Sequence, residues 1–181
     1  MEEFSSELKK IRGDLSFREM GEKTGLSHAY LVQLEQVYNP NNKKVRLPSP
    51  KALRKISNAF HISYIALMIK VGFLISDDIS EIKNYDKGKE EFVFESELKK
   101  LRGDLSFREM AKKTGLSHTY LFQLEQNPKN NKVILPSPNA LRKIANAFHI
   151  SYVDLMINVG YLTADDISEI RNYNSLSRRM A

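Results

Sequence analysis

The sequence contains no cysteine, so it can form neither disulfides nor thiolate metal sites, and it is compatible with a reducing compartment. It also lacks any apolar run near 18 residues, and we expect no membrane-spanning segment. The first residues, MEEFSSELKKIRGD, are acidic and then amphipathic, without the apolar stretch of a signal peptide. Together these absences favour a cytoplasmic protein.

Motifs for catalysis are missing as well. There is no Gly-rich phosphate loop and no Ser or Cys nucleophile motif. Asp77 and Asp78 are explained by the start of a helix, where carboxylates meet the positive end of the helix dipole. His61 and His149 have no second histidine or carboxylate at ligand spacing, and each is expected in a left-handed conformation at a helix end. We therefore expect no enzyme, no metal and no cofactor.

Positive charge is plentiful and unevenly distributed. The net charge is +6 and the pI is about 9.4, which suggests a polyanionic partner. Residues 9–55 hold eleven basic and four acidic side chains, and residues 99–143 hold ten and three. Residues 56–85, in contrast, hold two basic and three acidic side chains. Such clustering is what neutralisation of phosphates requires.

The chain is an internal duplication. Residues 4–36 match residues 94–126 at 27 of 33 positions, and residues 39–85 match residues 127–173 at 35 of 47. This similarity is too high for convergence, so the repeat decides the domain organisation. The predicted parts are a first domain at 1–85, a linker at 86–91, a second domain at 92–174 and a tail at 175–181.

Each copy carries the start and stop signals of helices and no alternation typical of strands. Gly13 ends a first helix, and Ser16 with Glu19 forms a capping box for a second. Gly25 supplies a turn, after which Ser27 caps a third helix. Further helices are expected to begin at Ser49-Pro50, at Ser63 and at Ser76. The predicted class is all-α, with five to six helices in each copy.

The segment from Phe17 to Leu34, repeated from Phe107 to Leu124, has the spacing of a DNA-binding helix-turn-helix. A small residue, Gly21 or Ala111, stands where the two helices must touch. The stretch GLSHAYLVQLE at 25–35 and Pro48-Ser49-Pro50 are the strongest matches to a known family. In these residues each copy resembles the Cro/phage-repressor (XRE family) domain, over roughly 4–75 and 94–163.

This resemblance implies a lambda-repressor-like fold and a sequence-specific regulator of transcription that binds double-stranded DNA. A repressor of phage or mobile-element character is implied, in the bacterial cytoplasm and associated with the nucleoid. In this family the start of the third helix enters the major groove. The implied base-reading residues are His28, Ala29, Gln33, His118, Thr119 and Gln123. A glutamine amide can bond both N6 and N7 of adenine.

The resemblance also implies contacts to phosphate. These residues are Ser16, Arg18, Ser27, Tyr30, Lys43, Lys44, Arg46, Arg108, Ser117, Tyr120, Lys129 and Lys132. Tyr30 and Tyr120 have the alternative of packing against the following loop. One departure is that Phe17 and Phe107 replace the glutamine common at the start of the second helix. The lost polar contact can be taken over by Arg18 and Arg108.

Some charged residues have structural interpretations instead. Arg12 with Glu35, and Arg102 with Glu125, match an ion pair that is usual in this fold. Lys9, Lys10 and Lys55 have the alternatives of a phosphate contact and a solvated helix face.

The later part of each copy is more apolar than five short helices need. We predict that the copies pack through it as an internal pseudo-dimer; the alternative is an ordinary core covered by a sixth helix. The predicted interface residues are Tyr64, Leu67, Met68, Tyr152, Leu155 and Met156. Two-fold packing would require an inverted repeat in DNA, and tandem packing a direct repeat.

A different class of function stays open. The same fold can serve as a protein-interaction module, such as an antitoxin or an antagonist of a regulator. Phe17, Tyr30 and Val32, or Phe122 in the second copy, would suit a protein partner.

Overall fold

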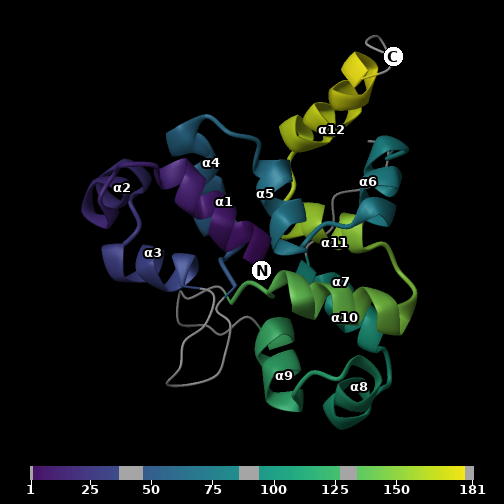
Figure 1. Cartoon of the computed structure of the whole chain (residues 1–181). Coiled ribbons are helices and arrows are strands. Elements are labelled where there is room, and N and C mark those ends of the chain that lie inside the picture. The colour runs from purple at the N-terminus through teal and green to yellow at the C-terminus, as the bar shows by residue number, and fades with distance from the viewer. Residues whose placement is uncertain (1, 37–46, 86–93, 127–133, 178–181) are drawn as a thin grey trace. The chain divides into compact units, whose positions relative to one another are not determined.

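The computed structural model of the chain describes residues 2–36, 47–85, 94–126 and 134–177. Every element of regular structure in these ranges is a helix, so the all-α prediction is confirmed. The chain divides into two compact units, Met1–Ser76 and Asp77–Ala181. Figure 1 labels the helices in chain order.

The described residues of the first unit form five short helices. They are α1 (Glu2–Arg12), α2 (Phe17–Thr24), α3 (His28–Glu35), α4 (Pro50–Phe60) and α5 (Tyr64–Val71). Helix α1 packs on α3 and α5, α2 packs on α3 and α4, and α4 packs on α5. The buried side chains at the centre include Phe4, Leu8, Met20, Leu53 and Ile56.

The second unit holds the remaining helices and repeats the same order. They are α6 (Ser76–Lys83), α7 (Phe94–Arg102), α8 (Phe107–Thr114), α9 (His118–Gln126), α10 (Pro138–Phe148), α11 (Tyr152–Asn158) and α12 (Ala164–Ser177). Helices α7 to α11 correspond to α1 to α5 in the sequence repeat. The packing of α8 on α9 and α10, and of α10 on α11, also repeats that of the first unit.

Local sequence signals position these helices as predicted. The Ser16 hydroxyl accepts a hydrogen bond from the Glu19 amide at 3.2 Å, while a Glu19 carboxylate oxygen accepts one from the Ser16 amide at 2.7 Å. Ser27, Ser49 and Ser63 cap α3, α4 and α5. Each side chain satisfies an amide that has no partner within its helix.

The histidines that end α4 and α10 adopt the predicted left-handed conformation. His61 has a φ of 52° and His149 a φ of 54°, and they are the non-glycine residues of the described chain with positive φ. Because each amide then bonds back to the preceding turn, the chain leaves the helix sharply. This turn sends it directly into α5 or α11. The structural explanation of both histidines therefore holds.

Helix α6 belongs to the second compact unit, although its sequence ends the first repeat copy. The Arg142 guanidinium on α10 donates two hydrogen bonds of 2.6 Å to the Asp78 carboxylate. The Ser151 hydroxyl, which caps α11, donates to Glu81. Ile82 on the same helix is fully buried. The compact unit therefore begins at residue 77, whereas the sequence repeat ends at residue 85.

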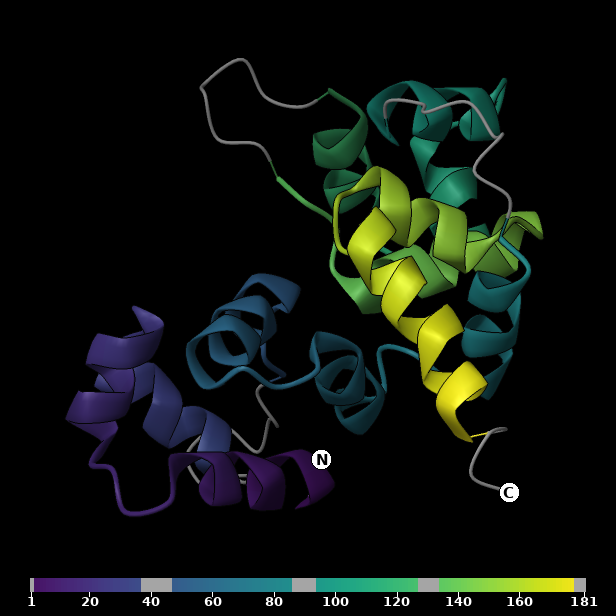
Figure 2. The same cartoon turned by 90° about the horizontal axis from the view of Figure 1, so that it is seen from above.

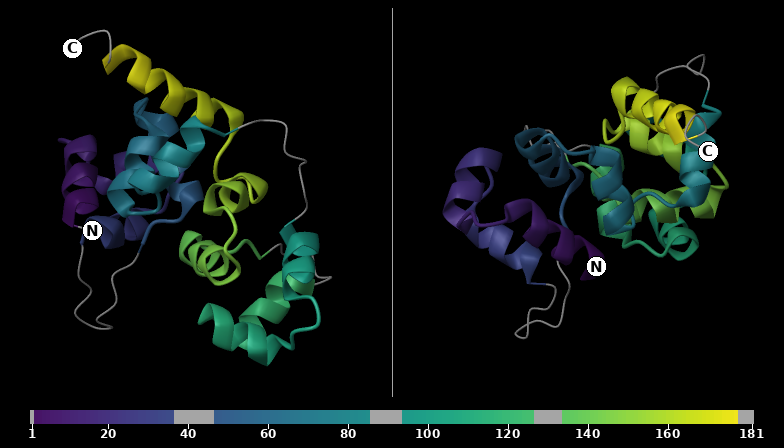
Figure 3. Two further views of the ribbon diagram at one scale, coloured as in Figure 1. Left: turned by 90° about the vertical axis from the view of Figure 1, so that its right-hand side faces the viewer. Right: turned by 45° about the horizontal axis from the view of Figure 1, so that its top comes forward.

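The last helix extends further than the tail we set apart at 175–181. Helix α12 continues to Ser177, because no proline or glycine interrupts it after Ala164. Within the second unit it runs beside α6, and Figure 2 shows this pair from above. The Arg171 side chain donates to the carbonyl of Tyr85, directly after α6. Figure 3 gives two further views of the same helices. The predicted linker at 86–91 lies outside the described residues.

Candidate functional site

The connection between α2 and α3 is a tight turn held by side-chain and backbone hydrogen bonds. Gly25 adopts a φ of 62° and its amide bonds to the Gly21 carbonyl at 2.8 Å. The Thr24 hydroxyl donates to the Met20 carbonyl at 2.7 Å and accepts from the Leu26 amide at 3.3 Å. The second copy repeats the left-handed glycine and the threonine bonds. Both turns are therefore fixed by residues within them.

At Gly21, helix α2 lies close to the turn that precedes α3. A Cβ atom at this position would lie 2.8 Å from the Leu26 carbonyl oxygen, closer than a normal contact. Ala111 takes the equivalent place in the second copy. This approach explains why a small residue stands there, as the motif predicted.

The predicted base-reading residues of each copy lie together on one exposed helix face. His28, Ala29 and Gln33 are exposed on α3, while Leu31 and Leu34 of the same helix are buried. Positions 29 and 33 are one turn apart, so their side chains are neighbours. The second trio has the same placement. It consists of His118, Thr119 and Gln123 on α9.

A bidentate ion pair fixes α3 against α1, as the sequence predicted. The Arg12 guanidinium donates to the two carboxylate oxygens of Glu35 at 2.8 and 2.9 Å, and to the Leu15 carbonyl at 2.9 Å. The hydrogen bond to Glu35 raises the pKa of Arg12 above its ordinary value. The Arg12 guanidinium also covers the Phe17 ring, 4.5 Å from its centroid. One side chain thus ties together α1, the start of α2 and the end of α3.

The equivalent pair in the second copy has the same geometry. Arg102 bonds Glu125 at 2.7 and 2.9 Å and lies 4.8 Å from the centroid of Phe107. The predicted structural role of both pairs is confirmed.

Several predicted phosphate contacts lie at the exposed N-termini of α2 and α3. Ser16 and Ser27 are exposed, and their hydroxyls accept hydrogen bonds from backbone amides as helix caps. Ser117 has the same capping bond in the second copy, at 3.2 Å. Arg18 is exposed and pairs with Glu22 at 3.5 Å, and Arg108 is exposed on α8.

The Glu19 carboxylate that closes the first capping box carries a shifted pKa. The Ser16 hydroxyl and then the Ser16 amide lower the pKa of Glu19 below its ordinary value of 4.5. Glu109 shows the same lowered pKa beside Ser106. The boxes therefore keep these carboxylates ionised to a lower pH than an isolated glutamate.

Tyr30 connects α3 to the start of α4, and Tyr120 connects α9 to the start of α10. The Tyr30 hydroxyl accepts a hydrogen bond from the Ser49 amide, and Tyr120 accepts one from Ser137, both at 3.3 Å. This geometry favours the packing alternative for both tyrosines. The remaining predicted phosphate contacts lie outside the described residues. They are Lys43, Lys44, Arg46, Lys129 and Lys132.

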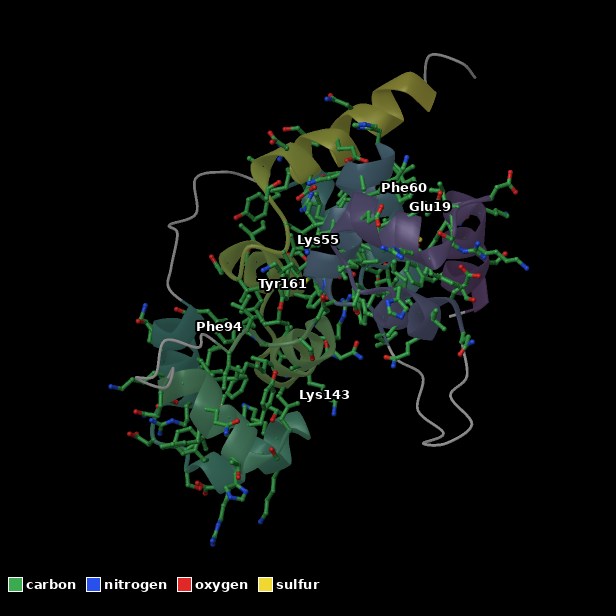
Figure 4. All side chains as sticks on the ribbon, turned by 90° about the vertical axis from the view of Figure 1, so that its left-hand side faces the viewer. Glu19, Lys55, Phe60, Phe94, Lys143 and Tyr161 are labelled. Atoms are coloured by element: carbon green, nitrogen blue, oxygen red, sulfur yellow. The ribbon has the colours of Figure 1, made fainter. Side chains whose placement is uncertain are left out.

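Two lysines have a role that sequence reasoning missed. Lys55 on α4 donates from its ammonium to the Gly25 carbonyl at 2.7 Å, and Lys143 does the same to Gly115 at 3.0 Å. Figure 4 labels both side chains. The Lys55 ammonium therefore lies at the negative C-terminal end of the α2 dipole, and the Lys143 ammonium at that of the α8 dipole. Their repetition at equivalent positions was the available signal, but their partner is about 30 residues away in the chain.

The residues predicted to join the copies are all buried. The ring of Tyr64 lies under the Arg54 guanidinium, 3.5 Å away, and Tyr152 lies under Arg142 at the same distance. The first stack lies within the first compact unit, and the second lies within the second unit. The others are Leu67, Met68, Leu155 and Met156. Their role as an interface between copies stays a prediction.

No protein-family model, curated protein or solved structure matches the chain. Within the described ranges, no group of three or more acidic or histidine side chains is arranged to hold a metal ion. None of the helices described combines the length and the apolar character that crossing a bilayer requires.

Proposed function

We propose that the chain is a sequence-specific regulator of transcription that binds double-stranded DNA. In this proposal α2–α3 and α8–α9 are two helix-turn-helix units of lambda-repressor-like domains, and α3 and α9 are their recognition helices. The chain acts as a single-chain pseudo-dimer on two related half-sites, most simply as a repressor of phage or mobile-element type.

The observation that carries the proposal is the repeated exposed face of α3 and α9. Each face presents a histidine, a small residue and a glutamine over two turns, while the opposite face is buried. An α-helix of this kind fits the major groove of B-DNA, and a glutamine amide matches the N6 and N7 atoms of adenine. The capping boxes, the glycine turns and the arginine–glutamate pairs hold the face rigid. Such preorganisation lowers the entropic cost of binding.

Charge supports the same partner. The regions that contain the recognition helices each carry a net charge of +7. Residues 9–55 hold eleven basic and four acidic side chains, and residues 99–143 hold ten basic and three acidic ones. Phosphate neutralisation makes affinity fall steeply with salt, with a slope of about −0.9 for each phosphate neutralised. Covalent linkage of two units makes the second contact intramolecular. One unit alone is then expected to bind roughly 10²- to 10⁴-fold more weakly.

Selection of bound duplexes from a random library tests this function. The wild-type chain should enrich a motif with two related half-sites. A variant with Gln33→Ala and Gln123→Ala should lose the preference for adenine in both, because the amides that read it are gone. A matched control is Asn58→Ala with Asn146→Ala, which removes two exposed amides from α4 and α10. The control should keep the wild-type motif.

Weak binding without any enrichment, equal in all three proteins, would overturn the DNA-reading function. It would favour the protein-interaction module instead, for which the half-exposed Phe122 ring on α9 is the specific observation.

A further inference from the structure

The two recognition surfaces are not identical. Between residues 16–36 and 106–126 the copies differ at four positions, and two of these lie on the recognition helix. Ala29 is replaced by Thr119, and Val32 is replaced by Phe122. The histidine and the glutamine are unchanged. On the recognition helices, a difference between the two half-sites must therefore come from the other two positions, since the histidine and the glutamine make the same contacts in both copies.

Phe122 is a large apolar side chain held in place at the surface. Its ring is 50% exposed and packs edge-to-face against Phe107, with 5.4 Å between the ring centroids. Phe107 in turn lies beside the Arg102 guanidinium, which Glu125 fixes by two hydrogen bonds. Helices α7, α8 and α9 all contribute to this stack. One side of the Phe122 ring thus contacts Phe107, and the other faces solvent.

The first copy has the same support without the final ring. Arg12 covers Phe17 and bonds Glu35, as in the second copy. Val32, which takes the place of Phe122, is smaller and only partly exposed. The support is therefore common to both copies, and the apolar surface is particular to the second.

The position of Phe122 on α9 relates it to the recognition face. It lies four residues after His118 and three after Thr119, so its side chain neighbours both of them on the helix surface, whereas Gln123 lies about 100° further round the helix. In the major groove the apolar group that a base pair presents is the thymine methyl, whereas cytosine presents an amino group there. An exposed ring that is already in place can cover that methyl. Cytosine has only a hydrogen at the carbon that bears this methyl in thymine, so it would offer the ring less apolar surface.

We propose that Phe122 determines specificity for a thymine methyl group in the half-site of the second copy, and that the two half-sites are therefore unequal. This inference rests on the proposed DNA-binding function. Charge on the neighbouring helix favours the same copy. Glu22 on α2 pairs with Arg18, whereas its counterpart on α8 is Lys112, so no such pair can restrain Arg108. Helix α8 therefore has a net charge two units more positive than that of α2, although regions 9–55 and 99–143 have the same net charge.

The experiment starts from the duplex that the wild-type chain selects. The thymine predicted to face Phe122 is replaced by deoxyuridine, which removes the methyl group and keeps every hydrogen-bonding group. We expect a loss of affinity of about fourfold, the effect of one methyl group no longer buried. In Phe122→Val, which installs the residue of the first copy, the same substitution should have no effect. Circular dichroism checks that this surface variant keeps its helices.

Val32→Phe is the reciprocal variant. Because Phe17 and Arg12 supply the same support, a ring at position 32 should create a thymine preference in the first half-site. The two selected half-sites should then differ only where Ala29 and Thr119 differ.

The outcomes separate the two proposals. No enriched motif in the wild-type chain would overturn both. An enriched motif with identical half-sites, or an equal effect of deoxyuridine on wild type and Phe122→Val, would overturn the role of Phe122 alone. In that case the DNA-binding function would stand.

Discussion

Tyr161 occupies the same position in the second copy as a phenylalanine does in the first, so only the second copy has a hydroxyl group there. Its hydroxyl donates to the Pro136 carbonyl at 2.8 Å, and Figure 4 labels the side chain. The first copy has Phe73 at the equivalent position. Burial, with a smaller contribution from Tyr120, raises the pKa of Tyr161 from 10.0 to about 12. The folded chain therefore holds this proton more tightly than the unfolded chain does.

A pKa raised by folding predicts a loss of stability at alkaline pH. The contribution of Tyr161 is complete below pH 10 and disappears as the pH rises towards 12, because the unfolded chain then releases the proton more readily. Because the side chain is partly exposed and screened by solvent, the loss amounts to ~1 kcal/mol by pH 12. Tyr161→Phe, which copies the first repeat, should remove this part of the pH dependence. Urea unfolding of both proteins between pH 9 and about 12 measures it. Parallel curves for the two proteins would contradict the prediction.

At the scale of the helix, Gly21 and Ala111 provide a matched pair of positions. Alanine favours a helix interior over glycine by about 0.5–1 kcal/mol. Ala111→Gly should therefore destabilise the chain by about that amount. Gly21→Ala should bring no equal gain, because its new Cβ would lie 2.8 Å from the Leu26 carbonyl oxygen and the turn must shift.

Urea denaturation of both single variants, compared with wild type, tests the pair. Stabilisation by Gly21→Ala that mirrors the loss in Ala111→Gly would mean that the close approach imposes no constraint on α2. Ala111 stands at the equivalent position of α8, so the two variants make opposite exchanges of glycine and alanine at matched positions.

The elements could be predicted from sequence because their signals are local. The serine caps, the glycine turns and the left-handed His61 act on residues within one helical turn, and each appears where expected. The exposed trio on α3 followed from the same local spacing. The bonds from Lys55 to Gly25 and the ring contact of Phe122 with Phe107 join residues far apart in the chain. A pattern with a period of a few residues carries no information about such contacts.

At the scale of the whole chain, the first copy of the sequence repeat and the first compact unit end at different residues. The repeat reaches Tyr85, while the second compact unit starts at Asp77. The sequence could not reveal this difference, because Asp78 and Ile82 have identical counterparts in Asp166 and Ile170. The placement of α6 depends on tertiary contacts with α10 and α11. The last helix of the first copy is thus part of the structure of the second unit.

The ion pair between Asp78 and Arg142 is the contact that makes this placement testable. Burial works against the charge of Arg142, but the hydrogen bonds and charge of Asp78 outweigh it and raise the pKa of Arg142. The side chain of Asp78 is 5% exposed. Removing the Asp78 carboxylate leaves the partly buried Arg142 guanidinium without its ionic partner, at a cost of about 1–3 kcal/mol. Asp78→Asn should therefore destabilise α10 and α11 of the second unit as well as α6, on which the substitution lies.

Hydrogen exchange of the full-length chain can locate that loss. In Asp78→Asn the amides of α6, α10 and α11 should exchange faster, while those of α1 to α3 keep their wild-type rates. Asp77→Asn is the matched control: it makes the same change one residue earlier on α6, at an exposed position. Faster exchange confined to the first unit, or equal effects of both variants, would mean that α6 does not stabilise the second unit through Arg142. The expected pattern would establish that a segment encoded by one copy completes the fold of the other. The second copy would then not be an independent module, because its compact unit needs a segment that the first copy encodes.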